Sequence, residues 1–224
     1  MTSTVPWHDA AATVTDLSAL FAPRGIAVVG ASRNPSKLGA TLARSLSGFA
    51  ARHGHLALVN GRDETMHPSL AAAADAGPID LAMVCVPAAV CPAVLDDAAR
   101  AGAGAAVICG GGFAEAGGTG VGYQTALADV VANTGIRLLG PNTSGFLAPH
   151  AGVTASFVPG AAQVRPGRVA VVAASGGVNH ALCFLLTEAG HGISLAVGIG
   201  NAVDISAPDV SFRFRAVSWI STPR

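Results

Sequence analysis

A glycine turn followed by two basic residues is the part of the sequence best suited to holding an anion. Gly30 lies at the end of the apolar run 25–31, and Arg33 and Lys37 follow just before leucines begin to recur at helical spacing. A glycine lets the backbone approach a phosphate closely, and the free N–H groups at the start of a helix favour negative charge. The stretch 24–46 is therefore predicted to be a strand, a tight turn and a helix that together bind a phosphate group.

The same turn departs from the fingerprint of a dinucleotide site. That fingerprint requires G-x-G-x-x-G after the first strand and an acidic residue at the end of the second strand, where it binds the ribose hydroxyls. Ser32 stands at the second glycine position, and Asn60 ends the second apolar run. Both departures count against NAD, whereas the two basic residues favour an anionic cofactor with more than one phosphate. An NAD(H)-binding regulatory protein remains the alternative.

Apolar runs and helical segments alternate along the chain up to about residue 148. Strands are predicted at 25–31, 55–60, 79–87, 105–113 and 136–142, and helices at 38–49, 69–77, 93–102 and 121–135. Most of the strands are apolar throughout, which indicates a parallel sheet that is covered by helices on both faces. The predicted fold class is therefore α/β, with a Rossmann-like parallel sheet in the first domain.

A second, smaller unit is predicted after a linker at 149–167. A strand at 168–177, a helix at 178–190 and a strand at 193–201 repeat the pattern, which then stops. Two strands and one helix form only an incomplete flavodoxin-like α/β unit. About 60 residues rarely bury enough surface to fold alone. We therefore expect this unit to be stabilised by self-association or by a partner subunit, with aromatic residues of the tail helping to cover it: Phe212, Phe214 and Trp219.

The composition argues against several classes of protein. Thirteen basic residues balance thirteen acidic ones, and only 12% of the residues are charged and 5% aromatic, so no basic field or stacking surface for nucleic acid is expected. The longest apolar run, 81–95, is shorter than a membrane span and contains two prolines. The four cysteines form no CxxC pair and the N-terminus shows no secretory signal, so we expect buried free thiols, no metal site and a cytoplasmic location.

Five motifs, in this order, resemble the CoA-binding domain of ADP-forming acyl-CoA synthetases. They are FAPRGIAVVGAS with KLG, VN, DLAMVCVP, GGFAEAG and GPNTSG, and the resemblance covers roughly residues 17–205. The alpha subunit of succinyl-CoA synthetase has the same fold. The resemblance implies a Rossmann-like domain that holds coenzyme A across the carboxyl ends of its strands.

The cofactor-binding positions predicted on this basis are Gly30, Ala31, Ser32, Arg33, Lys37, Asn60, Val86, Pro87, Gly110, Gly111, Gly112 and Asn142. The resemblance implies that the residues from Gly30 to Lys37 meet phosphate and that Asn60 lies near the adenosine. It implies that Val86 and Pro87 border the pantetheine arm and that the three glycines line the path of the thiol. Glu115 and Asn142 match positions beside the acyl-transfer centre.

The segment AASGGVNHA is similar to the next domain of the family, where Ser-Gln-Ser-Gly is usual and Ala174 here replaces the glutamine. In the family, the start of this helix stabilises a phosphorylated histidine through its free N–H groups and dipole. The resemblance therefore implies a phosphate-binding helix N-terminus at Ser175, Gly176 and Gly177. Thr143 stands where GPNTSG commonly has a cysteine.

No catalytic residue is assigned from the sequence. The phosphohistidine of the family is expected dozens of residues later, and neither His180 nor His191 matches its position. The predicted function is CoA binding by a relative of this acid–thiol ligase family that is not expected to complete the reaction alone. Its expected partners are CoA or acyl-CoA and either an ATP-grasp subunit or a second copy, and a non-catalytic subunit of a larger synthetase is a further alternative.

The predicted organisation of the chain has five segments. They are an N-terminal extension at 1–16, the CoA-binding domain at 17–148, a linker at 149–167, a partial second domain at 168–210 and an atypical tail at 211–224.

Overall fold

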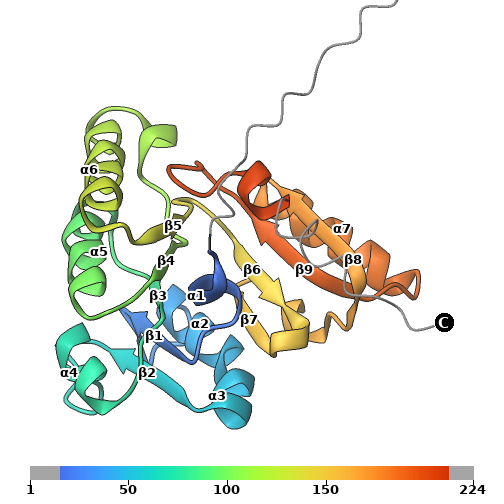
Figure 1. The fold of residues 1–224 in the computed structure, drawn as a ribbon, viewed down its shortest axis with the longest axis horizontal. Coiled ribbons are helices and arrows are strands. Elements are labelled where there is room, and N and C mark those ends of the chain that lie inside the picture. The colour runs from blue at the N-terminus through green and yellow to red at the C-terminus, as the bar shows by residue number, and fades with distance from the viewer. Residues whose placement is uncertain (1–15, 212–224) are drawn as a thin grey trace, which may run out of the picture.

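Two β-sheets form the framework of the protein in a computed structural model that describes residues 16–211 (Figure 1). The five strands of the first sheet are β1 (Gly25–Val29), β2 (His55–Val59), β3 (Leu81–Val84), β4 (Ala105–Ile108) and β5 (Arg137–Leu139). All its neighbouring strands are parallel, and their order is β2-β1-β3-β4-β5. The α/β class and the parallel sheet predicted from the sequence are thereby confirmed.

Helices cover both faces of the first sheet, which explains why its strands are apolar throughout. One face packs against α1 (Ser18–Phe21), α2 (Leu38–Ser45) and α3 (Ser47–His53), and the other against α4 (Leu70–Ala76), α5 (Cys91–Arg100) and α6 (Thr119–Thr134). Within β1, Ile26 and Val28 join the first of these two cores, while Ala27 and Val29 join the second. Successive side chains of a strand point to opposite faces, so both sets must be apolar.

The helix predicted at 38–49 is interrupted. α2 ends at Ser45 and α3 begins at Ser47, although Leu46 and Phe49 are buried as the spacing predicts. The Ser47 hydroxyl donates a hydrogen bond of 2.8 Å to the carbonyl of Arg44, and Gly48 follows. A side chain that competes for a helix carbonyl and a residue of low helix propensity both weaken the helix at this point.

The second sheet is mixed and has the strand order β7-β6-β9-β8. Its members are β6 (Gly145–Ala148), β7 (Val153–Ser156), β8 (Pro166–Ala173) and β9 (Ile193–Gly198), and helix α7 (Gly176–Glu188) packs on β8 and β9. Only the β8–β9 pair is parallel. Short 3₁₀ turns occur at Ala88–Val90, Ala114–Ala116, Pro149–Ala151 and Ala161–Gln163.

The prediction that 149–167 is a linker is wrong. This segment contains β7, which pairs with β6, and β6 in turn pairs with β9, so the second sheet already begins at Gly145. Each of these two strands has only four residues, too few to show a clear period. Their stability comes from pairing across the sheet, as between Phe146 and Val197, which are far apart in the chain.

The two sheets share one hydrophobic core, which lies between the face covered by α1–α3 and the second sheet. The rings of Phe21 and Phe146 meet edge to face with their centroids 5.2 Å apart. After β9 the chain runs back along the first sheet, where the N–H of Ile205 donates to Leu138 at 3.1 Å. Arg137 binds Asp204 through two hydrogen bonds of 2.8 and 3.0 Å. This pair and the shared core fasten the second sheet to the first.

The sequence shows no helical period after 205, but a helix begins at residue 207. The carboxylate of Asp209 accepts hydrogen bonds from the N–H and hydroxyl of Ser206 and so caps its first turn, and Val210 is buried. The predicted covering residues Phe212, Phe214 and Trp219 lie outside the described residues. Within 16–211, no helix combines the length and hydrophobicity needed to cross a membrane.

Candidate functional site

The strand order of the first sheet places its topological switch point between β1 and β3, and we refer to the carboxyl ends of these two strands as the β1–β3 crevice. The connection after β1 leads to α2 on one face, and the connection after β3 leads to α5 on the other face. A parallel sheet binds its ligands at such a switch point, outside the carboxyl ends of the strands. Gly30 follows β1 here, and a Cβ atom on it would lie 3.1 Å from a methyl carbon of Val86, which follows β3. The structure thus brings the glycine turn together with Val86 and Pro87.

The glycine turn is held by hydrogen bonds that leave part of its backbone free. The side-chain oxygen of Asn34 accepts from the N–H and hydroxyl of Ser36 at 3.0 and 2.7 Å, and the Asn34 carbonyl accepts from Lys37 N–H at 3.0 Å. The N–H groups of Ser32 and Arg33 have no hydrogen-bond partner among the described residues. The first N–H groups of α2 also lack partners within the helix. This turn therefore offers several donors to an anion.

The two basic residues of the turn differ in their surroundings. Arg33 lies 3.1 Å from the carboxylate of Asp63 and also donates to the Thr65 hydroxyl. Hydrogen bonds from Thr65, assisted by the charge of Arg33, lower the pKa of Asp63. Lys37 is exposed and forms no ion pair with any described residue. Of the two, Lys37 has the charge that is available to a ligand.

Asn60 lies at the end of β2 and ties that strand to the glycine turn. Its side-chain nitrogen donates to the carbonyl of Ala31 at 2.8 Å, and its side-chain oxygen accepts from Arg62 N–H at 3.0 Å. An ionised acidic residue could not make the first of these bonds. Asn60 therefore supports the shape of the turn, a contact that the sequence did not reveal.

The glycine loop after β4 is built around Glu115. One carboxylate oxygen of Glu115 accepts from the N–H groups of Gly112 and Phe113 at 2.6 and 3.1 Å, and the other accepts from Asn201 at 2.5 Å. Desolvation acts to raise the pKa of Glu115, but the hydrogen bonds from Asn201, Phe113 and Gly112 outweigh it and lower the pKa. Glu115 is therefore held as a carboxylate beside this loop.

Asn201, which follows β9, connects the second sheet to the first at this site. The positions predicted from the sequence do not include it. Besides Glu115, its side chain contacts Gln124 at 2.8 Å and Asn142 at 3.3 Å. Asn142 has a left-handed backbone, with φ 58°, and its N–H donates to Gly110 at 3.0 Å. The signal that could have identified Asn201 is its place shortly after β9, within the segment GIGNAVDI.

Helix α7 begins against the loop that carries Asn142. A Cβ atom on Gly176 would clash with the Ser144 hydroxyl oxygen, so glycine is required for this close approach. Ser175 caps the helix by accepting from Val178 N–H at 3.4 Å. The Ser144 hydroxyl is buried and has no partner in the part of the chain described. Thr143, at the position where a cysteine is common, donates to the carbonyl of Gly198 instead.

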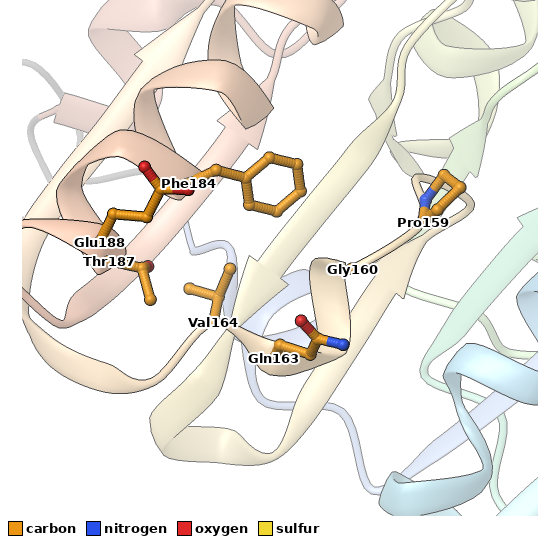
Figure 2. A pocket seen from close by; sticks show the side chains of 7 residues that line it. All are labelled: Pro159, Gly160, Gln163, Val164, Phe184, Thr187 and Glu188. Carbon is orange, nitrogen blue, oxygen red and sulfur yellow. The ribbon is translucent and has the colours of Figure 1, made fainter.

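The structure thus groups the predicted positions into two sets. The glycine turn, Val86 and Pro87 meet at the β1–β3 crevice, and the loop 110–112, Asn142 and the start of α7 meet where the two sheets join. A cavity of about 270 Å³ under α7 (Figure 2) is lined by Phe184 and Gly160 but by none of the predicted positions. It therefore belongs to neither set.

The cysteines are free thiols, as predicted, although Cys85 is only half-buried. Desolvation raises the pKa of Cys85 to about 12, with Cys91 adding to the effect, and desolvation alone raises the pKa of Cys91 to about 12. Burial also raises the pKa of Cys109 and Cys183. A thiol in this state is a poor nucleophile, because the thiolate is the reactive form.

His180 is a buried, hydrogen-bonded residue of α7. One ring nitrogen lies 3.0 Å from the Gly176 carbonyl, which can only accept, so that nitrogen carries the proton. The other lies 3.0 Å from the hydroxyl of Ser156, which then donates to it. Desolvation lowers the pKa of His180. The ring is therefore neutral and fully bonded.

We expect His180 to make the protein less stable in mild acid. Its pKa is lowered in the folded state, so the unfolded chain binds more protons below about pH 6.5, and the free energy of unfolding falls as the pH falls. Urea unfolding between pH 7.5 and 5.5 should show a smaller loss in His180→Gln than in the wild type. An equal loss in both proteins would contradict this assignment.

These features define an α/β fold whose parallel sheet carries, at the carboxyl end of β1, a glycine turn with free N–H groups and basic residues suited to a phosphate. The chain belongs to the family described as the CoA binding domain, which it matches over residues 24–149. The family confirms both the predicted resemblance and coenzyme A as the cofactor.

Curated relatives extend the similarity into the second sheet. The alpha subunit of acetate–CoA ligase (ADP-forming) I from Pyrococcus furiosus is 32% identical over 202 residues, which cover 87% of this chain and 43% of that protein. Acetate–CoA ligase (ADP-forming) II from Archaeoglobus fulgidus is 32% identical over 210 residues, or 88% of this chain and 30% of that protein. The chain therefore spans less than half the length of these relatives.

Solved structures agree with this relationship. The dinucleotide-forming acetyl-coenzyme A synthetase 1 of Ca. Korarchaeum cryptofilum, in complex with phosphate and ADP, has a TM-score of 0.80 and 33% identity, and the match covers 89% of this chain and 42% of that one. A protein of Pyrococcus horikoshii OT3 has a TM-score of 0.81 and 27% identity, covering 90% of this chain and 46% of that one. Both sheets of the present chain thus occur together in related proteins.

Proposed function

We propose that the chain binds coenzyme A at the β1–β3 crevice, with the phosphates over the start of α2. The observation that carries this proposal is one turn in which the N–H groups of Ser32 and Arg33 and the cation of Lys37 all lack a partner among the described residues. Val86 and Pro87 border the same crevice and supply an apolar wall for the pantetheine arm. We assign the thiol end to the loop 110–112, next to Asn142.

The alternative cofactor NAD(H) is disfavoured by the end of β2. A dinucleotide site needs a carboxylate there to accept hydrogen bonds from the ribose hydroxyls. Asn60 occupies the position, and both ends of its side-chain amide already bond to Ala31 and Arg62. Asp63 is nearby but pairs with Arg33.

We infer that the chain contributes the CoA-binding part of an ADP-forming acyl-CoA synthetase. Support comes from the relatives, which are acetate–CoA ligases of this type. The carboxylate of Glu115, the amides of Asn142 and Asn201, and the start of α7 with Ser175 converge near the proposed thiol end. We assign acyl transfer to this region and assign no catalytic role to His180, whose ring is buried and fully bonded.

We further propose that α7 contacts another part of such a synthetase, either an ATP-grasp partner subunit or a second copy of this chain. Val178, Leu182 and Leu185 are 53%, 43% and 62% exposed on α7. Strand β8 is at the edge of its sheet, and no other strand of residues 16–211 pairs with its outer side. Light scattering on the purified chain tests whether α7 contacts a second copy. A chain that stays monomeric at all concentrations would exclude this contact.

Calorimetry with CoA and NADH tests the proposed cofactor. CoA is expected to bind one site per chain with an affinity at least about tenfold higher than that of NADH, because only CoA suits a turn that lacks the ribose-binding acid. Dephospho-CoA, which lacks one phosphate, serves as a matched ligand and should bind more weakly. Equal affinities for CoA and NADH would refute the proposal.

A further inference from the structure

A second cavity with an excess of positive charge lies between the two sheets, away from the proposed cofactor crevice. Its volume is about 450 Å³, and its walls come from α2 and α3 on one side and from the segments around β6, β7 and β8 on the other. Arg44, Arg52 and Arg165 line it, together with the hydroxyls of Ser47 and Thr154. No acidic residue lines the cavity among the described residues.

The arginines of this cavity differ from most other arginines among the described residues. Nine arginines lie within residues 16–211, and four of them pair with carboxylates, namely Arg24, Arg33, Arg100 and Arg137. Five arginines of this region have no acidic partner, and three of those five line this one cavity. The Arg44 side chain donates a hydrogen bond of 3.3 Å to a neutral group, the hydroxyl of Thr41.

Three exposed guanidinium groups, none of them paired with an acid among the described residues, give this cavity a positive potential that favours an anion. Guanidinium groups bind phosphate oxygens through paired, charge-assisted hydrogen bonds. The described cavity lining contains no aromatic residue to stack on a nucleotide base, and its charged groups are all guanidinium groups, which pair with phosphate. A ligand of this cavity is therefore expected to be recognised through its phosphate groups.

The cavity is distinct from the CoA crevice because the two lie at opposite ends of α2. Lys37 precedes the first residue of the helix, whereas Arg44 lies in its last turn. Seven residues of α-helix separate them by about 10 Å along the helix axis. In addition, none of the predicted cofactor positions lines the cavity.

We propose that this cavity is a second binding site, which takes a small anion carrying two or more linked phosphate groups. The anion connects Arg44 and Arg52 of the first sheet's helices with Arg165 of the second sheet. A ligand bound to both sheets stabilises the folded arrangement in which they are packed together. The stability of the packing between the two sheets therefore depends on the concentration of such an anion.

Isothermal titration of the full-length chain with tripolyphosphate tests this site. We expect one tripolyphosphate to bind per chain, and we expect Arg44→Gln, Arg52→Gln and Arg165→Gln each to weaken binding about tenfold, as for loss of one charge-assisted contact. Arg62→Gln and Arg168→Gln are matched controls, because both arginines are exposed and lack acidic partners but lie outside the cavity. These controls should change the affinity less than about twofold.

Further titrations distinguish this cavity from the CoA crevice and from a site for an acidic protein segment. Lys37→Ala should leave tripolyphosphate binding unchanged, because Lys37 lies outside the cavity, so a failure of the proposed CoA site does not affect this result. ATP should bind the cavity within about threefold of tripolyphosphate, since only phosphates are recognised. The proposal is overturned by the absence of binding at millimolar tripolyphosphate, or by equal losses in the two control variants or in Lys37→Ala. Binding of polyglutamate in place of tripolyphosphate would overturn it in favour of an acidic protein segment.

Discussion

Replacing Lys37 by alanine is expected to lower the affinity for coenzyme A about 10- to 100-fold, a loss of roughly 1.5–3 kcal/mol for one charge-assisted hydrogen bond. Lys37 is exposed at the start of α2 and has no acidic partner among the described residues, so its charge is available to a phosphate. Calorimetry on the purified variant measures the loss directly, and the effect should shrink as salt is added.

The fold itself should tolerate the loss of Lys37. Its side chain makes no hydrogen bond or ion pair with any described residue, so thermal unfolding of the unliganded variant should match that of the wild type. Arg168→Ala is the matched control, because Arg168 is also exposed and unpaired among the described residues but lies on the second sheet. If Lys37→Ala bound CoA with unchanged affinity, or if Arg168→Ala lost as much affinity, the phosphates of CoA would not bind at the start of α2.

Replacing Gly39 by alanine is expected to destabilise the protein by about 1–3 kcal/mol and to weaken CoA binding as well. A Cβ atom at this position would clash with the carbonyl oxygen of Gly30 and would lie 3.0 Å from the Cα of Ala31. Both are backbone atoms of the glycine turn, so α2 can accept the methyl group only by moving away from the turn. Such a movement separates the free N–H groups of the turn from those of the helix.

Chemical unfolding and calorimetry on Gly39→Ala measure the two effects separately. Gly122→Ala is the control, because Gly122 lies within α6 with nothing within 4 Å of its Cβ position. Alanine there should leave the stability unchanged or raise it by up to about 1 kcal/mol, owing to its higher helix propensity. If Gly39→Ala were as stable as Gly122→Ala and still bound CoA normally, the close packing of α2 on the turn would not matter for binding.

The local features of the first sheet follow from the sequence alone. A strand buried on both faces must be apolar at every position, so the runs around β1, β3 and β4 are sufficient to indicate a parallel sheet. Gly30 and the basic residues after it indicate a phosphate site because the chemistry depends on neighbours in the chain. The order of the motifs from residue 24 to 149 was likewise sufficient to identify the CoA-binding family.

Other features depend on contacts between distant residues, which local patterns do not contain. The four-residue strands β6 and β7 exist because β6 pairs with β9, some fifty residues later. Asn201 reaches Glu115 only after the second sheet has docked on the first, and Arg33 differs from Lys37 only because Asp63 folds back beside it. The arginine-lined cavity is likewise formed by segments from both sheets. Local composition thus determined most elements of the first sheet and the first half of the proposed cofactor site. Docking of the two sheets decided the short strands β6 and β7 and which side chains meet, because those contacts join residues far apart in the chain.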